Sequence, residues 1–540
     1  VLTSLKEADV AEVAEKLRQL GVDAVAVCLL HSFANPAHEA RVAELLQDAL
    51  PGVAVTASHD VLPVVREFER SMASVMNAVV MPGISRYVSR LEERLSVAGI
   101  KAHLMLMQSN GGTTGVASIR QAPVLTALSG PAAGVVGARA IAASSGHDNI
   151  ITVDIGGTSA DICLIRNGEI GLTQKGHVGD WPLPFPMVDM LTIGAGGGSI
   201  ARVTDGSLSV GPESAGAAPG PACYGQGGAL PTITDAHVVL GNLPNRLLGG
   251  RVSLDREAAI AAIQAHVAEP LEIPLTAAAQ GILDITNNQM IGAIRVVSVE
   301  RGHDPRDFTL VPFGGAGPLH ATALAELLGI GRVLIPPAPG VLCADGLLAA
   351  DLRSEFVRTL PLPGPIEEVD CGGLLKQMQR EAEAWLDAEN VPFGKRDLRQ
   401  VASLRFAGQG GELDVAWTSD ANALAQKFAA LHEAQYGFRL PAPVEIVAVR
   451  VEARARTERA ASITLPVAGP VNPVDHQTVS FAGGSIETAI YDRDALPEGA
   501  ELIGPAIVTQ LDCTTLIPQG WYACVLETGA LALNRQDVRS

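Results

Sequence analysis

The chain has 540 residues, of which 47% are hydrophobic, 18% charged and only 4% aromatic. That length exceeds one ordinary domain, and the apolar content is typical of a folded globular protein and argues against disorder. The net charge of −19 argues against a nucleic-acid partner, which would require clustered Lys and Arg side chains.

The chain shows no sign of export or membrane insertion. No segment approaches the ~20 apolar residues needed to cross a bilayer, and the start, from Val1 to Asp9, lacks a signal-peptide pattern. The 7 cysteines are dispersed without a Cys-x-x-Cys pair, which argues against a disulfide framework or a zinc ribbon. We therefore expect a cytoplasmic protein with reduced thiols and no membrane partner.

The first part of the chain alternates helical and strand patterns. Helices are expected at residues 7–20, 36–50, 66–81 and 85–98, and strands at residues 23–30, 53–57 and 103–107. Gly21 is the expected stop of the first helix. Strands that alternate with helices of this length predict a parallel or mixed sheet covered by helices.

The pattern changes twice further along. Residues 150–351 are rich in Gly and Pro, with strands expected at 150–154, 162–165 and 332–335 and a long helix at 276–299. After Asp351, strands are expected at 401–406, 413–417, 446–454, 506–510 and 514–517, and helices at 374–389 and 421–436. We predict an α/β protein with three domains, 1–148, 149–351 and a mainly β domain at 352–540.

The strongest local motif reads IITVDIGGTSADICLI, from Ile150 to Ile165. A strand delivers Asp154 to a turn at Gly156 and Gly157, and a second strand leaves through Asp161. A hairpin tip of this kind presents backbone N–H groups and the Thr158 hydroxyl to an anion, and a carboxylate there can hold Mg²⁺. The alternative is an ordinary hairpin with a Gly-Gly turn.

Two further glycine-rich segments are candidates for nucleotide contact. Gly314, Gly315 and Gly317 lie between an expected strand and a helix from Pro318, where free amides and the helix dipole favour an anion. A tight strand-to-helix turn explains that pattern equally well. Residues 194–199, which include Gly196 and Gly197, offer another backbone cradle, with a glycine density that packing alone does not readily explain.

Residues 128–134 (LSGPAAG) are a third candidate, either as an anion site or as the capped start of a helix packed through Ala and Gly. Hydrolytic and metal-binding motifs are absent: there is no His-Glu-x-x-His and no Gly-x-Ser-x-Gly. His237, His303 and His320 are isolated in sequence and are expected to be structural. Cys223 is a weak candidate nucleophile, because no partner histidine is identifiable.

Together these segments resemble the A-type subunit of the hydantoinase/oxoprolinase family, over most of the chain. The runs are 64–70 (VVREFER), 107–112 (MQSNGG), 129–138 (SGPAAGVVGA), 154–161 (DIGGTSAD), 192–201 (TIGAGGGSIA), 214–225, 231–236 (PTITDA), 298–308 (SVERGHDPRDF), 313–321, 339–353 and 504–521. The resemblance implies an actin-like ATPase fold, shared with sugar kinases and heat-shock chaperones, in which ATP lies between two lobes. It identifies residues 154–161 as the second phosphate loop and residues 314–317 as the adenosine loop.

The chain departs from that family in three places. The first phosphate hairpin of the family normally lies far upstream of Val1, and no such motif precedes Glu7, so we expect this chain to lack half of the phosphate grip. Ala218 stands where the family usually has an acidic residue, and Asp345 where it usually has an apolar one. The last two differences concern the substrate pocket and leave the nucleotide fold unaffected.

What the resemblance implies for function is ATP-dependent hydrolysis of a cyclic amide, of the hydantoin or 5-oxoproline type, by phosphorylation of its carbonyl oxygen. ATP and Mg²⁺ are the implied cofactors, and a B-type subunit is the implied partner in a hetero-oligomer. Asp154 is expected to bind Mg²⁺ and Asp161 to orient water or a second metal contact, so that both are catalytic. The expected nucleotide contacts are Gly156, Gly157, Thr158, Gly196, Gly197, Gly314, Gly315 and Gly317.

Two alternatives remain. In the ketone-carboxylase branch of the family, which includes the acetone carboxylase beta subunit, ATP activates a ketone enolate and bicarbonate. The other is a non-catalytic, actin-like structural or regulatory subunit.

Overall fold

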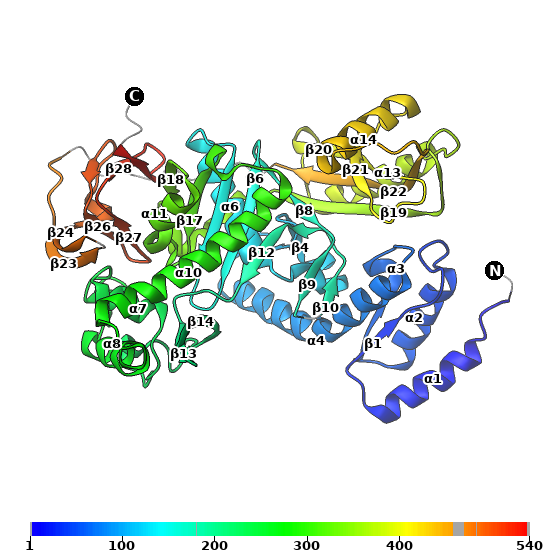
Figure 1. Cartoon of the computed structure of the whole chain (residues 1–540). Helices are drawn as coiled ribbons and strands as arrows, with labels where there is room; N and C mark the ends of the chain where they lie inside the picture. Colours follow the sequence, from blue (N-terminus) through cyan, green and yellow to red (C-terminus); the bar gives the residue numbers. More distant parts are fainter. Residues whose placement is uncertain (1–2, 180, 457–468, 482, 537–540) are drawn as a thin grey trace. The chain divides into compact units, whose positions relative to one another are not determined.

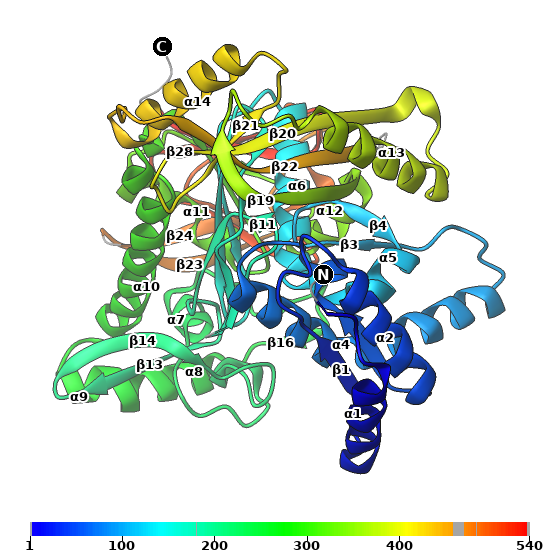
Figure 2. The ribbon, with the colours of Figure 1, turned by 90° about the vertical axis from the view of Figure 1, so that its right-hand side faces the viewer.

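The computed structural model describes residues 3–179, 181–456, 469–481 and 483–536, which fold into two compact units (Figures 1 and 2). Unit 1 comprises residues 1–132, 172–187 and 350–458, and unit 2 comprises residues 133–171, 188–349 and 459–540. Neither unit is one continuous stretch, so the predicted domains 1–148, 149–351 and 352–540 do not coincide with the units. The three-domain division stays a prediction.

The first part of unit 1 is a small parallel α/β layer. α1 (Glu7–Leu20), β1 (Ala24–Val27), α2 (Ala37–Ala49) and β2 (Ala54–Ala57) follow the predicted order, and β1 pairs with β2 in parallel. α1 ends where expected, because Gly21 adopts the left-handed conformation with φ of 64°. Apolar residues of these elements form one core cluster.

One prediction for this unit is wrong. The two helices expected at 66–81 and 85–98 form a single helix, α4 (Glu67–Val97), with Pro82 in its interior. Proline is disfavoured in a helix interior, because it lacks the N–H group needed for one backbone hydrogen bond. Here the helix buries Ala73 and Met81 before the proline and Val88 after it, and this tertiary burial outweighs the local cost.

A mixed sheet with the strand order β21-β20-β22-β19-β4-β3 makes up the rest of unit 1. Its strands are β3 (Met105–Met107), β4 (Thr113–Gly115), β19 (Leu352–Pro365), β20 (Arg396–Phe406), β21 (Leu413–Ala416) and β22 (Val444–Ala455). α13 (Gly372–Ala388) and α14 (Ala421–Tyr436) share a hydrophobic cluster with these strands, and Figure 2 shows α13 beside β19 and β22.

Unit 2 is built on a larger mixed sheet with the order β12-β6-β5-β17-β18-β29-β28-β25. Its strands are β5 (Ile150–Ile155), β6 (Ala160–Arg166), β12 (Met190–Ile193), β17 (Thr309–Phe313), β18 (Arg332–Ile335), β25 (Glu501–Ile503), β28 (Trp521–Val525) and β29 (Leu531–Arg535). β5, β17 and β18 run parallel in the centre, and the flanking strands pair antiparallel. The unit 2 sheet is therefore mixed.

Helices cover this sheet. α10 (Leu275–Val297), expected at 276–299, and α11 (Gly317–Leu328) contribute residues to the same core as β5 and β17. Figure 1 shows α11 beside β17. A smaller sheet with the order β23-β24-β26-β27 comes from Asp475–Phe481, Gly484–Asp492, Ala506–Thr509 and Thr514–Ile517. Within the described part of the chain, no helix is long and apolar enough to span a bilayer.

A buried carboxylate ties the first α/β layer together. Glu39, on α2, is fully buried and accepts hydrogen bonds from the backbone N–H of Leu29 at 2.6 Å, the backbone N–H of His59 at 2.8 Å and the Ser58 hydroxyl at 2.9 Å. Arg70, from the run 64–70, donates to the same Ser58 hydroxyl at 3.0 Å. Burial alone would raise the pKa of Glu39, but hydrogen bonds from His59, Leu29 and Ser58 lower it to about 2.

Replacing this carboxylate should therefore destabilise unit 1. A pKa of about 2, against an ordinary value of 4.5, corresponds to about 3 kcal/mol of stability at pH 7. Because the folded-state pKa is depressed, the contribution is present above the unfolded-state pKa and is lost as pH falls from 4.5 towards 2. We expect Glu39→Gln to lower the free energy of unfolding in urea at pH 7, with a difference from wild type that shrinks at pH 3.

The control is Glu44→Gln on the same helix. The Glu44 side chain is 63% exposed and pairs only with Arg41, so its loss should change stability by less than about 0.5 kcal/mol. Equal effects of the two substitutions would contradict the role given to Glu39.

Candidate functional site

The centre of the candidate site is the hairpin of β5 and β6. The strands pair antiparallel with Asp154 opposite Asp161, and Gly156 N–H donates to the Ser159 carbonyl at 3.1 Å to close the tip. Gly156, Gly157 and Thr158 are exposed at that tip, whereas most of the strand residues before it are buried. The predicted hairpin, framed by two carboxylates, is confirmed in geometry.

The two carboxylates lie close together without a neutralising cation. Burial, and then the charge of Asp161, raise the pKa of Asp154 to about 6, although a hydrogen bond from the Cys343 thiol to Asp154 Oδ2, at 3.5 Å, opposes the rise. Burial also raises the pKa of Asp161, against a 2.5 Å hydrogen bond from the Thr192 hydroxyl. No Lys or Arg ion pair to either carboxylate is found among the described residues. Two carboxylates placed in this way are suited to binding a cation.

Residues 194–199 pack directly behind the hairpin tip. Gly197 N–H donates to the Gly156 carbonyl at 2.9 Å and Gly198 N–H to the Gly157 carbonyl at 2.7 Å. A Cβ on Gly196 would lie 2.5 Å from the Thr158 nitrogen. Contrary to the expectation from sequence, close packing does explain the glycine density of this segment.

Gly196 and Gly197 use their N–H groups for hydrogen bonds within the protein. Both residues are buried, and Gly196 N–H is already bonded to the Ser199 hydroxyl at 2.9 Å. Their N–H groups therefore serve the protein and are not displayed at the surface.

The third glycine segment reaches the site from β17. Gly314 has φ of 79°, donates its N–H to the Pro339 carbonyl at 2.9 Å and lies so close to Asp154 that a Cβ would collide with the carboxylate. Ala316 N–H donates to the Ile155 carbonyl at 3.1 Å. Gly315 is exposed and Gly317 is buried at the start of α11. All ten predicted site residues lie in unit 2. The contacts described above bring the hairpin, residues 194–199 and residues 314–317 together.

The run 231–236 supports the site from α7 (Ile233–Leu240). The Thr232 hydroxyl caps this helix, and the hydroxyl of Thr234 donates to the Gly197 carbonyl at 2.8 Å. Asp235 accepts from the backbone N–H groups of Ala222, at 3.2 Å, and Cys223, at 2.8 Å. Burial and Asp235 raise the pKa of the Cys223 thiol, which therefore is not an activated nucleophile.

The helix that begins at Ser129, α6 (Ser129–Ser144), agrees with the packing interpretation of its small residues. A Cβ on Gly134 would lie 2.7 Å from the Phe313 ring, and one on Gly137 would lie 2.8 Å from the Leu342 carbonyl. These glycines let α6 approach β17 and the start of α12 (Leu342–Ala349).

Sequence reasoning missed several neighbours of the site. Thr192 and Cys343 bond to the two carboxylates, and Asp512 accepts from Gly340 N–H at 2.7 Å beside the Gly314 loop. All three lie in runs that carry the family resemblance, but nothing in their spacing reveals these partners. The expectation that His237 and His320 are isolated is wrong, because their Nε2 atoms lie 3.3 Å apart.

A preformed all-protein metal centre is not present in the described residues, since no three His, Cys, Asp or Glu side chains are grouped to hold an ion. The two carboxylates nonetheless fit Mg²⁺. That ion is commonly held by one or two carboxylates, with water and substrate phosphates completing its shell.

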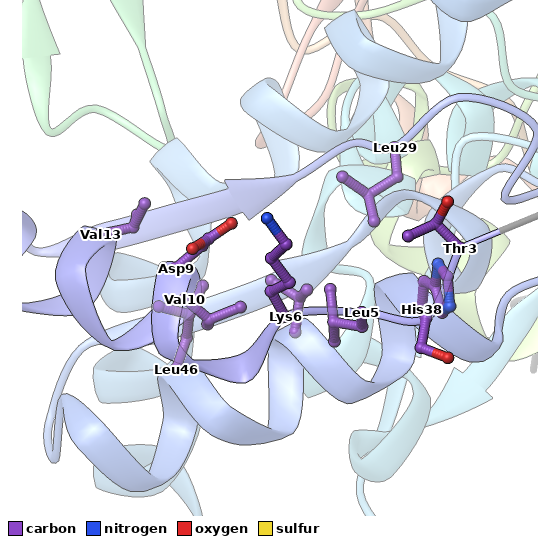
Figure 3. A pocket seen from close by; sticks show the side chains of 11 residues that line it. Thr3, Leu5, Lys6, Asp9, Val10, Val13, Leu29, His38 and Leu46 are labelled. Atoms are coloured by element: carbon purple, nitrogen blue, oxygen red, sulfur yellow. The ribbon is translucent and has the colours of Figure 1, made fainter.

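A separate pocket of about 460 Å³ lies in the first layer of unit 1 (Figure 3). Leu5, Val10, Leu29 and Leu46 form much of its wall, with Lys6 and Asp9 among the lining residues. It contains none of the predicted site residues, and its polar lining residues are Thr3, Ser4, Lys6, Asp9 and His38.

The chain is similar to known proteins over most of its length. A family model described as hydantoinase/oxoprolinase matches residues 70–356, and the model of its N-terminal region matches residues 1–50. The caprolactamase subunit alpha of Pseudomonas jessenii is 36% identical over 535 residues, which cover 96% of this chain and 77% of that protein.

Two solved structures are similar over nearly the whole chain. The ATP-dependent caprolactamase of Pseudomonas jessenii has a TM-score of 0.86 at 35% identity and covers 99% of this chain and 80% of its own. A nucleotide-free acetone carboxylase has a TM-score of 0.76 at 25% identity and covers 99% of this chain and 79% of its own.

The packing behind the hairpin leads to a testable expectation. Gly196→Ala would force backbone atoms of the hairpin tip apart, so we expect a loss of stability of roughly 2 kcal/mol. Gly292→Ala is the matched control, because this glycine is an exposed residue of α10 with open space around its Cβ, and alanine should stabilise that helix by roughly 0.5–1 kcal/mol. Urea unfolding of both variants measures the difference. A neutral Gly196→Ala would show that the loop does not press on the tip.

Proposed function

Because the chain belongs to the hydantoinase/oxoprolinase family, we propose that it is the ATP-binding subunit of an enzyme that hydrolyses a cyclic amide. The observation that carries this proposal is the exposed tip at Gly156–Thr158, with two unneutralised carboxylates at its base. The similarity to a caprolactamase described as ATP-dependent supports the choice of nucleotide and of substrate class. We propose for unit 2 one lobe of an actin-like ATPase fold.

The exposed groups of the site are assigned to nucleotide contact. Gly157 and Thr158 present backbone and hydroxyl groups at a position that phosphate oxygens can approach. Gly156 is exposed beside them, and its bond to the Ser159 carbonyl shapes the tip, while Gly315 is exposed on the side assigned to adenosine. The buried glycines Gly196, Gly197, Gly314 and Gly317 hold the exposed ones in place.

Asp154 is assigned to Mg²⁺, and Asp161 to a water or a second contact of the same ion. When bound, Mg²⁺ supplies positive charge that offsets the developing charge on the phosphates. The protein contributes the two carboxylates as hard oxygen ligands, and the Thr192 hydroxyl fixes Asp161 through its hydrogen bond.

The reaction we propose begins with attack of the amide carbonyl oxygen on the γ-phosphorus of ATP. The new bond is C–O–P, the bond that breaks joins phosphorus to the β-phosphate oxygen, and ADP leaves. The phosphorylated carbon is a better electrophile than the amide. Water then adds to this carbon, and the C–N bond of the ring breaks as its nitrogen takes up a proton, which leaves an acyl phosphate. A second water hydrolyses the acyl phosphate to a carboxylate and inorganic phosphate.

The sequence carries neither His-Glu-x-x-His nor Gly-x-Ser-x-Gly, and we propose that a second, B-type subunit completes the reaction in a hetero-oligomer. The relative from Pseudomonas jessenii is named as a subunit, which supports this assembly. We place the protein in the cytoplasm, because all 7 of its cysteines are free thiols. Ketone carboxylation is the second candidate, favoured by the similarity to acetone carboxylase.

Asp154→Asn tests the assignment of the carboxylate. The substitution keeps the shape and removes the charge that a hard cation requires, so we expect ATP turnover by the full-length complex to fall about a hundredfold. The melting temperature should stay within about 2 °C of wild type, because relief of the repulsion with Asp161 offsets the lost bond from Cys343. Asp148→Asn, an exposed position just before the same strand, is the control and should leave turnover unchanged. A normal rate for Asp154→Asn would remove this residue from the catalytic set.

The substrate class and the need for a partner can be tested together. Phosphate release would be followed with cyclic amides and, separately, with acetone plus bicarbonate, each with and without the B-type subunit. We expect release only with a cyclic amide and both subunits. Release confined to the ketone and bicarbonate would favour the carboxylase, and hydrolysis by the A-type chain alone would disprove the need for a partner.

A further inference from the structure

Two buried histidines join the helices that carry the glycine loops of the site. His237 lies on α7 and His320 on α11, with 2% and 1% of their surfaces exposed, and their rings meet edge to face with centroids 4.9 Å apart. Their neighbours in sequence, Ala236, Val238 and Leu319, belong to one buried apolar cluster. Polar rings in such surroundings are stable only when their nitrogens are bonded.

The hydrogen bonds of this pair fix one arrangement of protons. His320 Nδ1 lies 2.7 Å from Asn287 Oδ1, an acceptor, so His320 carries its proton on Nδ1 and its Nε2 accepts. The His237 Nε2, at 3.3 Å from that atom, must then donate. Asn242 Nδ2 donates to His237 Nδ1 at 3.0 Å and completes the series. All four ring nitrogens are used, and both rings are neutral.

Protonation of either ring would break this series, because a donor would then face a donor. Burial lowers the pKa of His320 to about 4, and burial together with His320 lowers the pKa of His237. Groups that stay neutral throughout the physiological range are suited to positioning and not to proton transfer.

The two helices are also the supports of the nucleotide site. On α7, Thr234 holds the Gly197 carbonyl, and Gly197 in turn bonds to Gly156 at the hairpin tip. α11 begins at Gly317, the last residue of the loop 314–317. Gly314, at the start of this loop, lies against the Asp154 carboxylate. His237 and His320 each lie three residues beyond Thr234 and Gly317, about one helical turn. A directional bond between them therefore sets the separation of the two loops.

We propose that His237 and His320 are positioning residues for the nucleotide: their single hydrogen bond sets the distance between the hairpin support and the Gly314–Gly317 loop. The inference rests on the proposed function, since it assigns the loops to ATP. It predicts that the bond between α7 and α11 affects ATP binding, whereas the bond from His320 to Asn287 on α10 affects only stability.

Two conservative variants of His320 separate these bonds. In His320→Gln, the side-chain amide reaches the position of Nε2 and keeps the partner of His237, but loses the bond to Asn287. In His320→Asn, the shorter amide keeps the bond to Asn287 and loses the partner of His237. Each variant leaves one buried group unpaired, so the two should lose similar thermal stability.

The readouts are the KM for Mg²⁺-ATP, kcat and the melting temperature of the full-length complex. We expect His320→Asn to raise KM about tenfold, the size of one lost hydrogen bond, with kcat within about threefold of wild type. His320→Gln should keep KM within about threefold. Equal KM values at equal thermal stability would overturn the proposal, and so would a larger increase in His320→Gln.

A control and a second measurement keep the test decisive. His432→Asn changes another buried histidine, in unit 1, that bonds to Gln409 and Phe438, and it should lower stability without altering KM.

If the His320 variants do not fold, ¹⁵N NMR of histidine-labelled wild type reads the tautomers directly, with Nε2–H for His237 and Nδ1–H for His320 between pH 5 and 8. A protonated ring or a shared tautomer would overturn the proposal. Failure of the unmodified complex to bind Mg²⁺-ATP would instead refute the proposed function.

Discussion

The site depends on backbone packed directly against backbone. Behind the exposed tip at Gly156–Thr158, the segment 196–198 approaches so closely that a Cβ on Gly196 would lie 2.5 Å from the Thr158 nitrogen. Two N–H···O bonds, from Gly197 and Gly198, pin the tip at that separation. Side chains at these positions would push the tip away, and with it the N–H groups that face outward. The tip can meet an anion in a fixed geometry because it is supported from behind.

A second constraint is electrostatic. Asp154 and Asp161 are paired across two strands and half-buried, and burial, followed by the charge of Asp161, raises the pKa of Asp154 to about 6. Two like charges at this separation destabilise the folded protein unless a proton or a cation offsets them. A purely structural hairpin gains nothing from that cost, whereas a site that binds a cation with its phosphate ligand recovers it on binding. Strain of this kind is therefore a stronger argument for function than the hairpin geometry alone.

The parts of the structure that the sequence predicted are those decided by local pattern. β5 was expected at 150–154 and lies at Ile150–Ile155, and the boundaries of α14 and β27 match the prediction at both ends. These elements have a clear period and flanking turn residues, so neighbouring residues suffice to define them. The site residues followed from the same motifs and from their resemblance to a family.

What escaped prediction is what only the tertiary structure decides. Two helices were expected, at 66–81 and 85–98, but burial on both sides of Pro82 keeps α4 continuous. The pairing of His237 with His320 joins positions 83 residues apart, and no spacing rule brings them together. The strands after Asp351 are alike in pattern, yet β22 pairs with β19 in unit 1 whereas β29 pairs with β18 in unit 2. Contacts between residues far apart in the sequence cannot be predicted from local pattern or composition.

The buried and exposed glycines of the site consequently have different roles, although the sequence makes them look alike. Gly196, Gly197 and Gly314 have neighbours where a Cβ would stand, so they set the shape of the site. Gly157, by contrast, has open space around it and is exposed, so the protein itself does not require a glycine there. A glycine at this position leaves the backbone open to close approach, which is what the phosphate contact proposed above would use.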